Sequence, residues 1–330
     1  MLGCKWNCAR SLVLLCFSLI LSVQPAAASQ PVIGVSKSPL SLPLYVAQDQ
    51  GLFSRHGVQP ILKDCIGGVR CMTGMFEGQY DMATSSELPV MFFSFDRADF
   101  SVVTTFVTNK HHSKFIHVKG LEKQQFQALV GKRIGVVPQT SSQYYLDVFL
   151  FFNGIDPKSV VQVHMQPEQM PEAMATGQVD AVSSWEPFGY RTLNRKPDAF
   201  KESRAPSLYT QTFNLIAGKR YLKSNPRQVQ AVLKAMQEAT VLIRENPAMA
   251  REVLKRNVEV DQDFLNYAFD GYRYELSLKQ SLITTMESQA KWAAAENYVA
   301  PGSKAPNLLH LIDATYLLKV NYKAVDFSFK

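Results

Sequence analysis

The chain has 330 residues, of which 46% are apolar, and its 35 Lys and Arg against 28 Asp and Glu give a net charge of +7. This length and apolar content suffice for two ordinary domains. The positive charge is spread without a Lys/Arg run or an alternation of basic and aromatic residues, so nucleic acid is not an expected partner. No apolar run after residue 28 is long enough to span a membrane, and we expect a soluble protein.

Residues 1–28 are predicted to be a secretory signal peptide. Two basic residues precede an apolar stretch over residues 11–23, and three alanines ending at Ala28 follow it. The apolar stretch is shorter than the roughly 20 residues of a spanning helix, although an uncleaved anchor is the alternative. We expect cleavage after Ala28, a periplasmic location and a net charge lowered by two. Lipidation of Cys16 is not expected, because Leu15 precedes it rather than a small residue.

The mature chain keeps two cysteines, Cys65 and Cys71. They flank residues 66–70, a predicted turn between a strand and a helix, where two α-carbons can come within the ~4.4–6.8 Å of a disulfide. We predict a bridge, which export favours. The alternative is a pair of small buried thiols. A metal site is not expected, because no His lies near and the spacing is not that of a zinc ligand pair.

Strands and helices are predicted to alternate through the first two thirds of the mature chain. The expected strands are residues 32–36, 58–64, 100–108, 115–119, 134–137, 160–163 and 181–184. The expected helices are residues 42–53, 69–77, 122–129, 144–152 and 168–176, with a connecting region at 208–218. The last third has apolar residues at helical spacing over 226–255 and 261–297, and residues 324–329 are a strand or a loose end.

A repeat is the most informative pattern. Residues 78–87 return as residues 177–186, with Gly, Gln, Asp, Ser and Glu in register. Each copy fits the end of a helix, a tight turn, a buried strand and a polar loop at the carboxyl end of that strand. Ligands of α/β sheets bind outside the carboxyl ends of strands, so the repeat suggests two lobes facing one cleft. Chance similarity of two helix-to-strand turns is the alternative.

Several segments resemble one known family. They are residues 43–47, 51–58, 78–81, 135–142 and 185–187. Together they are similar to periplasmic substrate-binding proteins of the nitrate/sulfonate/taurine class (NMT1/THI5-like), in order over nearly all of the mature chain. The resemblance implies an α/β, two-lobed type II fold that captures a small anionic or polar solute by hinge closure and delivers it to an ABC permease in the inner membrane. It does not identify the solute.

We expect each lobe to be a doubly wound, mainly parallel sheet flanked by helices. Lobe 1 would comprise residues 29–117 plus 216–330, with the helical C-terminal region on it, and lobe 2 residues 118–215. Short extended crossovers near residues 116–118 and 213–215 would permit hinge closure. We expect a monomer without a cofactor or a metal.

Thr140, Ser141 and Ser142 form the strongest candidate site. They stand where a strand turns into a helix, so their hydroxyls and free backbone N–H groups converge at the positive end of a helix dipole. Such a place holds an anion without Lys or Arg. The alternative is that Ser141 or Ser142 merely caps the helix, and the two roles are compatible. In this mechanism the three residues grip the acidic end of the solute, while Ser38, Ser85 and Trp185 complete the enclosure.

The other uncharged candidates lie at comparable strand ends. Ser38 occupies the matching strand-to-helix loop of lobe 1, and Ser85 and Ser86 end the first repeat strand or cap the next helix. Trp185 ends the second repeat strand and covers a flat or alkyl part of a ligand, unless it is a core residue. Helical phase turns one of the two tyrosines after the hydroxyl cluster, Tyr144 or Tyr145, inward, and we favour Tyr144 near the site.

Three charged residues are further candidates. Lys37 is a ligand contact or a solvated charge. Arg70 offers a charged fork for an acid, although an exposed Arg is more common. Glu186 fits a first helical turn, where a carboxylate favours the dipole; facing the cleft, it would repel a bare anion and welcome an amine or ring N–H.

An enzyme is not expected. His111 and His112 are predicted to lie in a solvated loop, without the spacing of a metal site or a catalytic triad. No nucleophile elbow, zinc-protease motif or phosphate-binding loop is present. The alternative function is a periplasmic sensor reporting to a membrane receptor. A pyrimidine-synthase-like enzyme is third, because the chain lacks the cysteine-rich motif of those enzymes.

Overall fold

The computed structural model describes residues 1–3, 30–121, 123–203 and 209–327. The predicted signal peptide and its cleavage site after Ala28 therefore lie outside the described residues, apart from the first three. Within the described part of the chain, no helix is long and apolar enough to cross a membrane.

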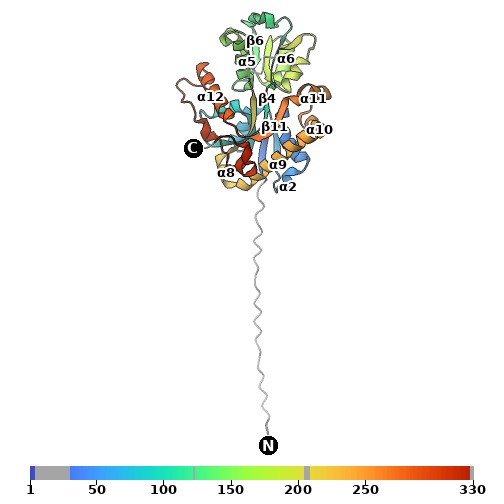
Figure 1. Ribbon diagram of the computed structural model, residues 1–330, viewed down its shortest axis with the longest axis vertical. Helices are drawn as coiled ribbons and strands as arrows, with labels where there is room; N and C mark the ends of the chain where they lie inside the picture. Colours follow the sequence, from blue (N-terminus) through green and yellow to red (C-terminus); the bar gives the residue numbers. More distant parts are fainter. Residues whose placement is uncertain (4–29, 122, 204–208, 328–330) are drawn as a thin grey trace.

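Two mixed sheets, each flanked by helices, organise the chain (Figure 1). We call the part built on the six-stranded sheet lobe 1 and the part built on the five-stranded sheet lobe 2. The order in lobe 1 is β11-β4-β10-β3-β1-β2, and in lobe 2 it is β7-β6-β8-β5-β9. The strands are β1 (Val32–Ser36), β2 (Ile61–Cys65), β3 (Met82–Ser86), β4 (Phe100–Asn109), β5 (Ser113–Val118), β6 (Arg133–Val136), β7 (Val161–His164), β8 (Ala181–Trp185), β9 (Phe200–Ser203), β10 (Gln211–Gly218) and β11 (Tyr272–Ser277).

The two-lobed α/β fold is confirmed, but the sheets are less parallel than predicted. In lobe 1, β1 pairs in parallel with β2 and β3, whereas β10 runs antiparallel to β3 and β4. In lobe 2, β6 pairs in parallel with β7 and β8, whereas β5 runs antiparallel to β8 and β9. β5 and β10 each begin where the chain enters a sheet from the other lobe, and a chain that leaves one sheet for another need not return through a parallel crossover. β11 adds a further antiparallel pair with β4 at the edge of the first sheet.

Helices cover both sheets. In Figure 1, α5 and α6 lie in lobe 2 at the top, and α2, α8 and α9 lie in lobe 1 below. Lobe 2 carries α5 (Ser141–Phe152), α6 (Met170–Ala175) and α7 (Phe188–Leu193). Lobe 1 carries α1 (Leu42–Asp49), α2 (Leu52–Arg55), α3 (Gly67–Phe76), α4 (Glu87–Phe93), α8 (Lys219–Ser224), α9 (Pro226–Glu245), α10 (Pro247–Val258), α11 (Gln262–Ala268), α12 (Gln280–Ala295) and α13 (Thr315–Val320).

The repeat is a true structural repeat. Gly78 and Gly177 have φ angles of 78° and 71°, the left-handed conformation expected just past a helix end. Asp81 then accepts a hydrogen bond from Val32 N at 2.8 Å, and Asp180 accepts one from Arg133 N at 2.9 Å. Val32 and Arg133 begin β1 and β6, the strands that pair in parallel with the two repeat strands. Each aspartate thus fixes the register of its own parallel pair.

The chain changes lobes earlier than predicted. Residues 116–118 and 213–215 were expected to cross, but they lie inside β5 and β10. The sheets exchange the chain between Asn109 and Ser113, and again between Ser203 and Gln211. Both segments were predicted to be connections, but their residues pair with neighbouring strands, which local sequence does not reveal. The division into lobes stays a proposal, and we place it at these two exchanges rather than at residues 117 and 215.

Three further element predictions were wrong. The expected helix over residues 42–53 breaks at Gly51, whose φ of 64° ends α1 and starts α2. Residues 123–129 form a 3-10 helix rather than an α-helix. Within the expected helical span 261–297, residues Tyr272–Ser277 form β11, which pairs with β4 at the edge of the sheet through Tyr272, Arg273, Tyr274 and Ser277. A neighbouring strand overrides local propensity there.

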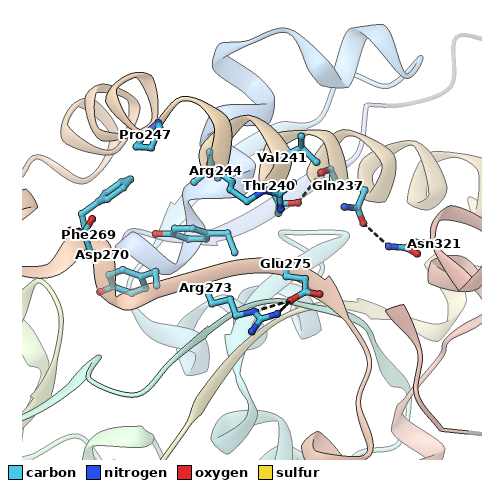
Figure 2. A pocket seen from close by; sticks show the side chains of 13 residues that line it. Gln237, Thr240, Val241, Arg244, Pro247, Phe269, Asp270, Arg273, Glu275 and Asn321 are labelled. Carbon is cyan, nitrogen blue, oxygen red and sulfur yellow. Dashed lines mark hydrogen bonds and ion pairs between the residues drawn. The ribbon is translucent and has the colours of Figure 1, made fainter. Parts of the chain in front are cut away.

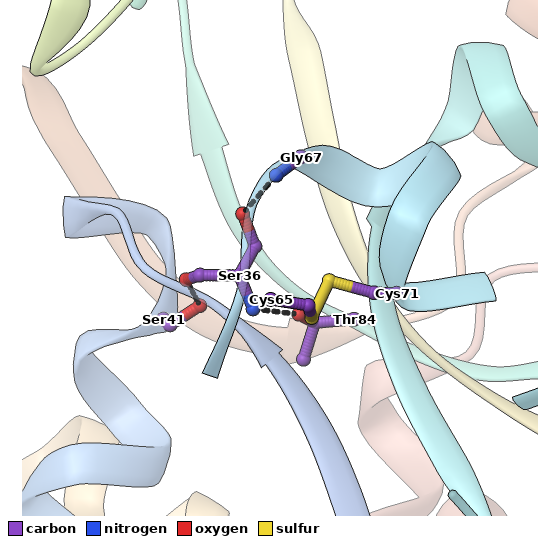
Figure 3. The surroundings of a disulfide bond; sticks show 6 residues. All are labelled: Ser36, Ser41, Cys65, Gly67, Cys71 and Thr84. Carbon is purple, nitrogen blue, oxygen red and sulfur yellow. Dashed lines mark hydrogen bonds between the residues drawn. A yellow bond between two sulfur atoms is a disulfide. The ribbon is translucent and has the colours of Figure 1, made fainter. Parts of the chain in front are cut away.

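The predicted disulfide is present. Cys65 ends β2 and Cys71 lies in α3, with their α-carbons 5.4 Å apart. The loop that the bridge closes contains Gly67, the first residue of α3, whose N–H donates to Ser36 Oγ at 3.2 Å (Figure 3). Ser36 N in turn donates to Thr84 Oγ1, which ties this loop to β1 and β3. The bridge therefore holds the start of α3 against the ends of two strands.

Removal of the bridge is expected to cost stability. We expect Cys65→Ser/Cys71→Ser to lower the free energy of unfolding by about 2 kcal/mol, because the unfolded chain regains the entropy of a short loop. Urea unfolding of the variant beside the oxidised wild type measures the difference. The reduced wild type is the matched control, since it should unfold like the variant; equal midpoints for oxidised and reduced protein would contradict the prediction.

Candidate functional site

A small cavity lies between the lobes, where strand ends and helix starts from both sheets converge. Its volume is about 20 Å³, room for about one water molecule. The polar or small residues that line it are Ser36, Ser38, Gly67, Gly68, Ser86, His112, Thr140, Ser141 and Gln211, and the apolar ones are Leu40, Pro89, Trp185 and Phe213. No Lys, Arg, Asp or Glu is among them. The cavity can therefore recognise a ligand only through neutral groups and backbone dipoles.

Three serine hydroxyls on this cavity have no hydrogen-bond partner in the described part of the protein. Ser38 is 2% exposed, and its Oγ is buried without a hydrogen bond. Ser86 and Ser141 are also buried, and among the described residues neither hydroxyl is hydrogen-bonded. A buried polar group without a partner costs about 1–3 kcal/mol. Ser38 Oγ is such a group, and together with the hydroxyls of Ser86 and Ser141 it gives this cavity three hydroxyls that can donate to a polar ligand.

Two helix starts, one from each lobe, meet at the cavity. Gly67 and Gly68 are the first residues of α3 in lobe 1, and Thr140 and Ser141 begin α5 in lobe 2. Both glycines are required: Gly67 has a φ of 74°, and a Cβ on Gly68 would lie 2.0 Å from Ser85 Oγ. First-turn N–H groups have no intrahelical partner and carry the positive end of the dipole. The cavity thus lies between two partial positive charges.

Thr140, rather than Ser141 or Ser142, is the cap of α5. Its Oγ1 accepts from Ser142 N at 3.2 Å and donates to Val137 O at 2.8 Å. It nevertheless lines the cavity, beside Ser141. Trp185 lines it from the end of β8, and a Cβ on Gly67 would lie 3.2 Å from the Trp185 ring, so the ring lies directly against lobe 1. Five of the eight uncharged candidates therefore meet at one place: Ser38, Ser86, Thr140, Ser141 and Trp185.

Three uncharged candidates lie away from the cavity lining. Ser142 is structural, since its Oγ accepts from Val137 N at 3.0 Å and donates to Ser183 O at 2.5 Å, joining α5 to β6 and β8. Ser85 Oγ donates to Ser86 O. Tyr144 packs edge-on against Tyr209 and Trp292, with ring centroids 5.2 and 4.9 Å away. Ser142 and Ser85 bond within their own lobes, whereas Tyr144 of α5 packs against Trp292 of α12 in lobe 1, away from the cavity lining.

The three charged candidates also lie outside the cavity lining, each with a protein partner. Lys37 Nζ pairs with Glu259 Oε1 at 2.6 Å. Arg70, on α3, reaches across the cleft: Nη1 lies 2.6 Å from Glu168 Oε1 and Nη2 donates to Gln166 Oε1 at 2.7 Å. This contact joins lobe 1 to the 3-10 turn Pro167–Gln169 of lobe 2. An exposed pair of this kind contributes little by itself, so it favours the closed arrangement only weakly.

Glu186 is buried behind the cavity. Its Oε2 accepts from Tyr190 N at 2.9 Å, which caps α7, and Oε1 lies 3.6 Å from Lys114 Nζ. Burial raises the pKa of Glu186 to about 7, although Lys114 opposes the shift. Lys114 also pairs with Glu202 at 3.2 Å. Glu186 therefore acts as the predicted cap within a buried ion cluster, and this cluster carries no group onto the cavity lining.

His112 and Gln211 were missed by the sequence analysis. His112 was expected in a solvated loop, but it is 2% exposed and lines the cavity. Gln211, the first residue of β10, lines it from the returning crossover. His112 follows β4 and Gln211 begins β10, so both residues lie at strand ends beside a crossover between the lobes. A polar residue at such a strand end was the signal that could have identified them. The sequence analysis missed this signal because it predicted both crossovers several residues too late in the chain.

Asp147 joins the two lobes on the α12 side. It lies on α5 and accepts hydrogen bonds from Trp292 Nε1 at 3.1 Å and Tyr298 Oη at 2.9 Å, which come from α12 and the segment after it. Gln162 Nε2 donates a third at 3.1 Å. Burial raises the pKa of Asp147 to about 6, and the hydrogen bonds from Tyr298 and Trp292 limit the shift.

This raised pKa of Asp147 predicts a pH-dependent stability. The folded-state pKa of about 6 lies above the unfolded value near 3.9, so the stabilising contribution is complete below about pH 4 and is lost as the pH rises through 6. We expect Asp147→Asn to reduce the fall in the free energy of unfolding between pH 4 and 6.5 by about 2 kcal/mol. Urea titrations across this range measure it, with the exposed Asp198→Asn as control. Parallel profiles for Asp147→Asn and wild type would contradict the prediction.

A larger groove lies on lobe 1 between α9 and β11, with a volume of about 630 Å³ (Figure 2). Four of its polar side chains bond to one another in pairs: Arg273 Nε donates to Glu275 Oε2 at 2.9 Å, and Asn321 Nδ2 donates to Gln237 Oε1 at 3.3 Å. None of the buried, partnerless polar atoms found among the described residues lines it. Size alone does not make it the better candidate. Across the same residues, no cluster of His, Cys, Asp and Glu is arranged to hold a metal ion.

The fold is that of the periplasmic binding proteins. The periplasmic aliphatic sulphonate binding protein SsuA from Escherichia coli aligns with a TM-score of 0.73 at 16% identity, covering 86% of this chain and 97% of that one. The alkanesulfonate-binding protein SsuA from Xanthomonas axonopodis pv. citri, solved bound to MOPS, aligns with a TM-score of 0.71 at 18% identity, covering 87% and 99%.

Sequence comparison gives the family. The chain belongs to the NMT1/THI5-like family, whose model matches residues 38–250. A putative aliphatic sulfonates-binding protein from Bacillus subtilis (strain 168) is 23% identical over 235 residues, which cover 70% of each chain. The resemblance inferred from the sequence is thereby confirmed at the level of family and fold.

Proposed function

We propose that the protein is the periplasmic solute-binding component of an ABC importer and captures a small oxyanion, of the sulfonate or nitrate type, in the cavity between its lobes. One observation carries the proposal: the buried, unpartnered hydroxyl of Ser38, two further serine hydroxyls and the starts of α3 and α5 line a single space, and no charged side chain is among its lining residues. Oxyanions accept hydrogen bonds in several directions, and helix N-termini favour negative charge. The named ligands of the sulfonate-binding relatives support the same class.

Closure follows from the size of the cavity. About 20 Å³ does not admit a sulfonate with its alkyl group, so we propose that the lobes separate at the two crossovers to admit the solute. Ligand contacts from both lobes then favour the closed state. Trp185, which touches lobe 1 across the cavity, would cover the apolar part of the solute.

A thermal-shift screen of residues 29–330 tests the proposal. The panel contains alkyl and aryl sulfonates, nitrate, bicarbonate, carboxylates and thiamine-related pyrimidines. A ligand at a hundredfold excess over its dissociation constant stabilises the protein by about 2.7 kcal/mol. We expect a shift with sulfonates or nitrate. A shift with pyrimidines alone would replace the oxyanion by a neutral ring, and no shift with any member would contradict the proposal.

The second candidate function is a periplasmic sensor with the same capture mechanism. Genes for a permease and an ATPase beside this one favour import, whereas a neighbouring kinase or cyclase gene favours signalling. The fold serves both roles equally well. We place import first because the matched relatives are named as binding proteins and not as receptors.

A further inference from the structure

We propose that His112 is a specificity-determining residue of this cavity: its ring, held by Tyr272, presents Nε2–H to an oxygen acceptor of the solute. The inference rests on the proposed function and names how the same site selects its ligand. It starts from position, because His112 immediately precedes β5 at the crossover from lobe 1 and lines the cavity. A side chain at this place meets the solute at the hinge itself.

The hydrogen bonds around the His112 ring determine its tautomer. His112 Nδ1 lies 2.9 Å from Tyr272 Oη, and this is the one hydrogen bond of Tyr272 Oη within the described part of the chain. A phenol proton needs an acceptor when it is buried, and Nδ1 is the acceptor at hand. If Tyr272 donates to Nδ1, the neutral ring carries its own proton on Nε2. That nitrogen, on the opposite edge of the ring, has no described hydrogen-bond partner, so it is left for a ligand.

The ring is held neutral by its surroundings. Burial lowers the pKa of His112 to about 3, and the nearby Lys114 ammonium adds to the shift. A neutral N–H donor binds an acceptor oxygen that lies in one direction from it, whereas a cation attracts any negative charge nearby. The two kinds of group therefore select different ligands. Gln211 provides a second neutral donor beside it. Gln211 Oε1 accepts from Ser113 Oγ at 3.3 Å, which leaves the amide N–H groups for the ligand.

Titration calorimetry with ethanesulfonate and with nitrate tests the inference. We expect His112→Phe to weaken binding by about 10- to 100-fold, the effect of one hydrogen bond to a charged acceptor. His112→Gln should retain most of the affinity, because its amide N–H replaces the ring Nε2–H. Tyr272→Phe should have a smaller effect than His112→Phe, since Tyr272 is a positioning residue. The matched control is the exposed neighbour, His111→Phe, with unchanged affinity.

A second measurement needs no variant. Nitrogen-15 NMR of the histidine rings should show His112 as the Nε2–H tautomer at pH 7, with an Nε2 shift that changes when ethanesulfonate binds. Observation of the Nδ1–H tautomer would overturn the inference. So would wild-type affinity of His112→Phe, and in that case the proposed function stands because the wild type binds. Absence of binding by the wild type to both anions would overturn the proposed function and this inference with it.

Discussion

Alanine at Ser38 and Ser141 together is expected to weaken oxyanion binding by about 100-fold or more. The two hydroxyls belong to different lobes, line the same cavity and have no hydrogen-bond partner in the described part of the protein. In the bound state each would donate to a charged acceptor, and a hydrogen bond of this type contributes about 1.5–3 kcal/mol. Because neither hydroxyl supports the fold, the variant should unfold at the wild-type urea concentration.

Ser142→Ala is the control for this experiment. It removes the same group one residue away, yet Ser142 Oγ bonds Val137 N and Ser183 O rather than the cavity. We expect it to lower the free energy of unfolding by about 1–3 kcal/mol and to leave affinity within a few-fold of wild type. Calorimetry and urea unfolding of both variants separate the two effects. Wild-type affinity for Ser38→Ala/Ser141→Ala would place the ligand elsewhere.

Glu87→Ala is expected to cause the largest loss of stability, about 4 kcal/mol. Glu87 is fully buried at the start of α4. Its carboxylate accepts hydrogen bonds from Tyr209 Oη, from Thr212 N and Oγ1, both at 2.9 Å, and from Gln289 Nε2 at 3.0 Å. Burial raises the pKa of Glu87, and the hydrogen bonds from Tyr209 and Gln289 oppose it. Truncation leaves four donors unpaired and a hole beside the returning crossover.

Urea unfolding measures this loss of stability, and two further variants serve as comparisons. Glu87→Gln keeps the volume and one acceptor oxygen, so we expect a smaller loss. Glu287→Ala removes an exposed carboxylate from α12, the helix that provides Gln289, and should change stability by no more than about 0.5 kcal/mol. A Glu87→Ala variant as stable as Glu287→Ala would show that the four donors find other partners.

Glu87 and Glu186 are the closing residues of the two repeat copies. Both are buried at the start of the helix that follows the repeat strand, and burial raises the pKa of each. One is surrounded by donors from the hinge and α12, the other lies beside Lys114. The glutamate that closes each repeat copy therefore lies at the same place in the fold of both lobes, although its bonding partners differ. Neither glutamate lines the cavity, so both support the site through its framework.

Local patterns predicted the site in part. A residue at or just after the end of a buried strand lies at the carboxyl edge of a sheet, and this rule found four hydroxyl residues, Ser38, Ser86, Thr140 and Ser141, and the aromatic Trp185, all of which line the cavity. The same rule could not tell Ser141 from Ser142. One faces the cleft and the other joins α5 to the sheet, and that difference depends on the rotation of the helix against β6 and β8.

The sequence by itself determined the two α/β units, their glycine and aspartate turns, the disulfide pair and the hydroxyl-bearing strand ends, because each depends on residues close together in the chain. The tertiary structure decided where the chain changes lobes, that β10 and β11 join the first sheet, and that His112 and Gln211 reach the cavity. These features depend on pairing between segments far apart in the chain. Local propensity carries no information about such partners. A polar residue that by itself predicts an exposed loop can therefore be buried between distant segments, as His112 is.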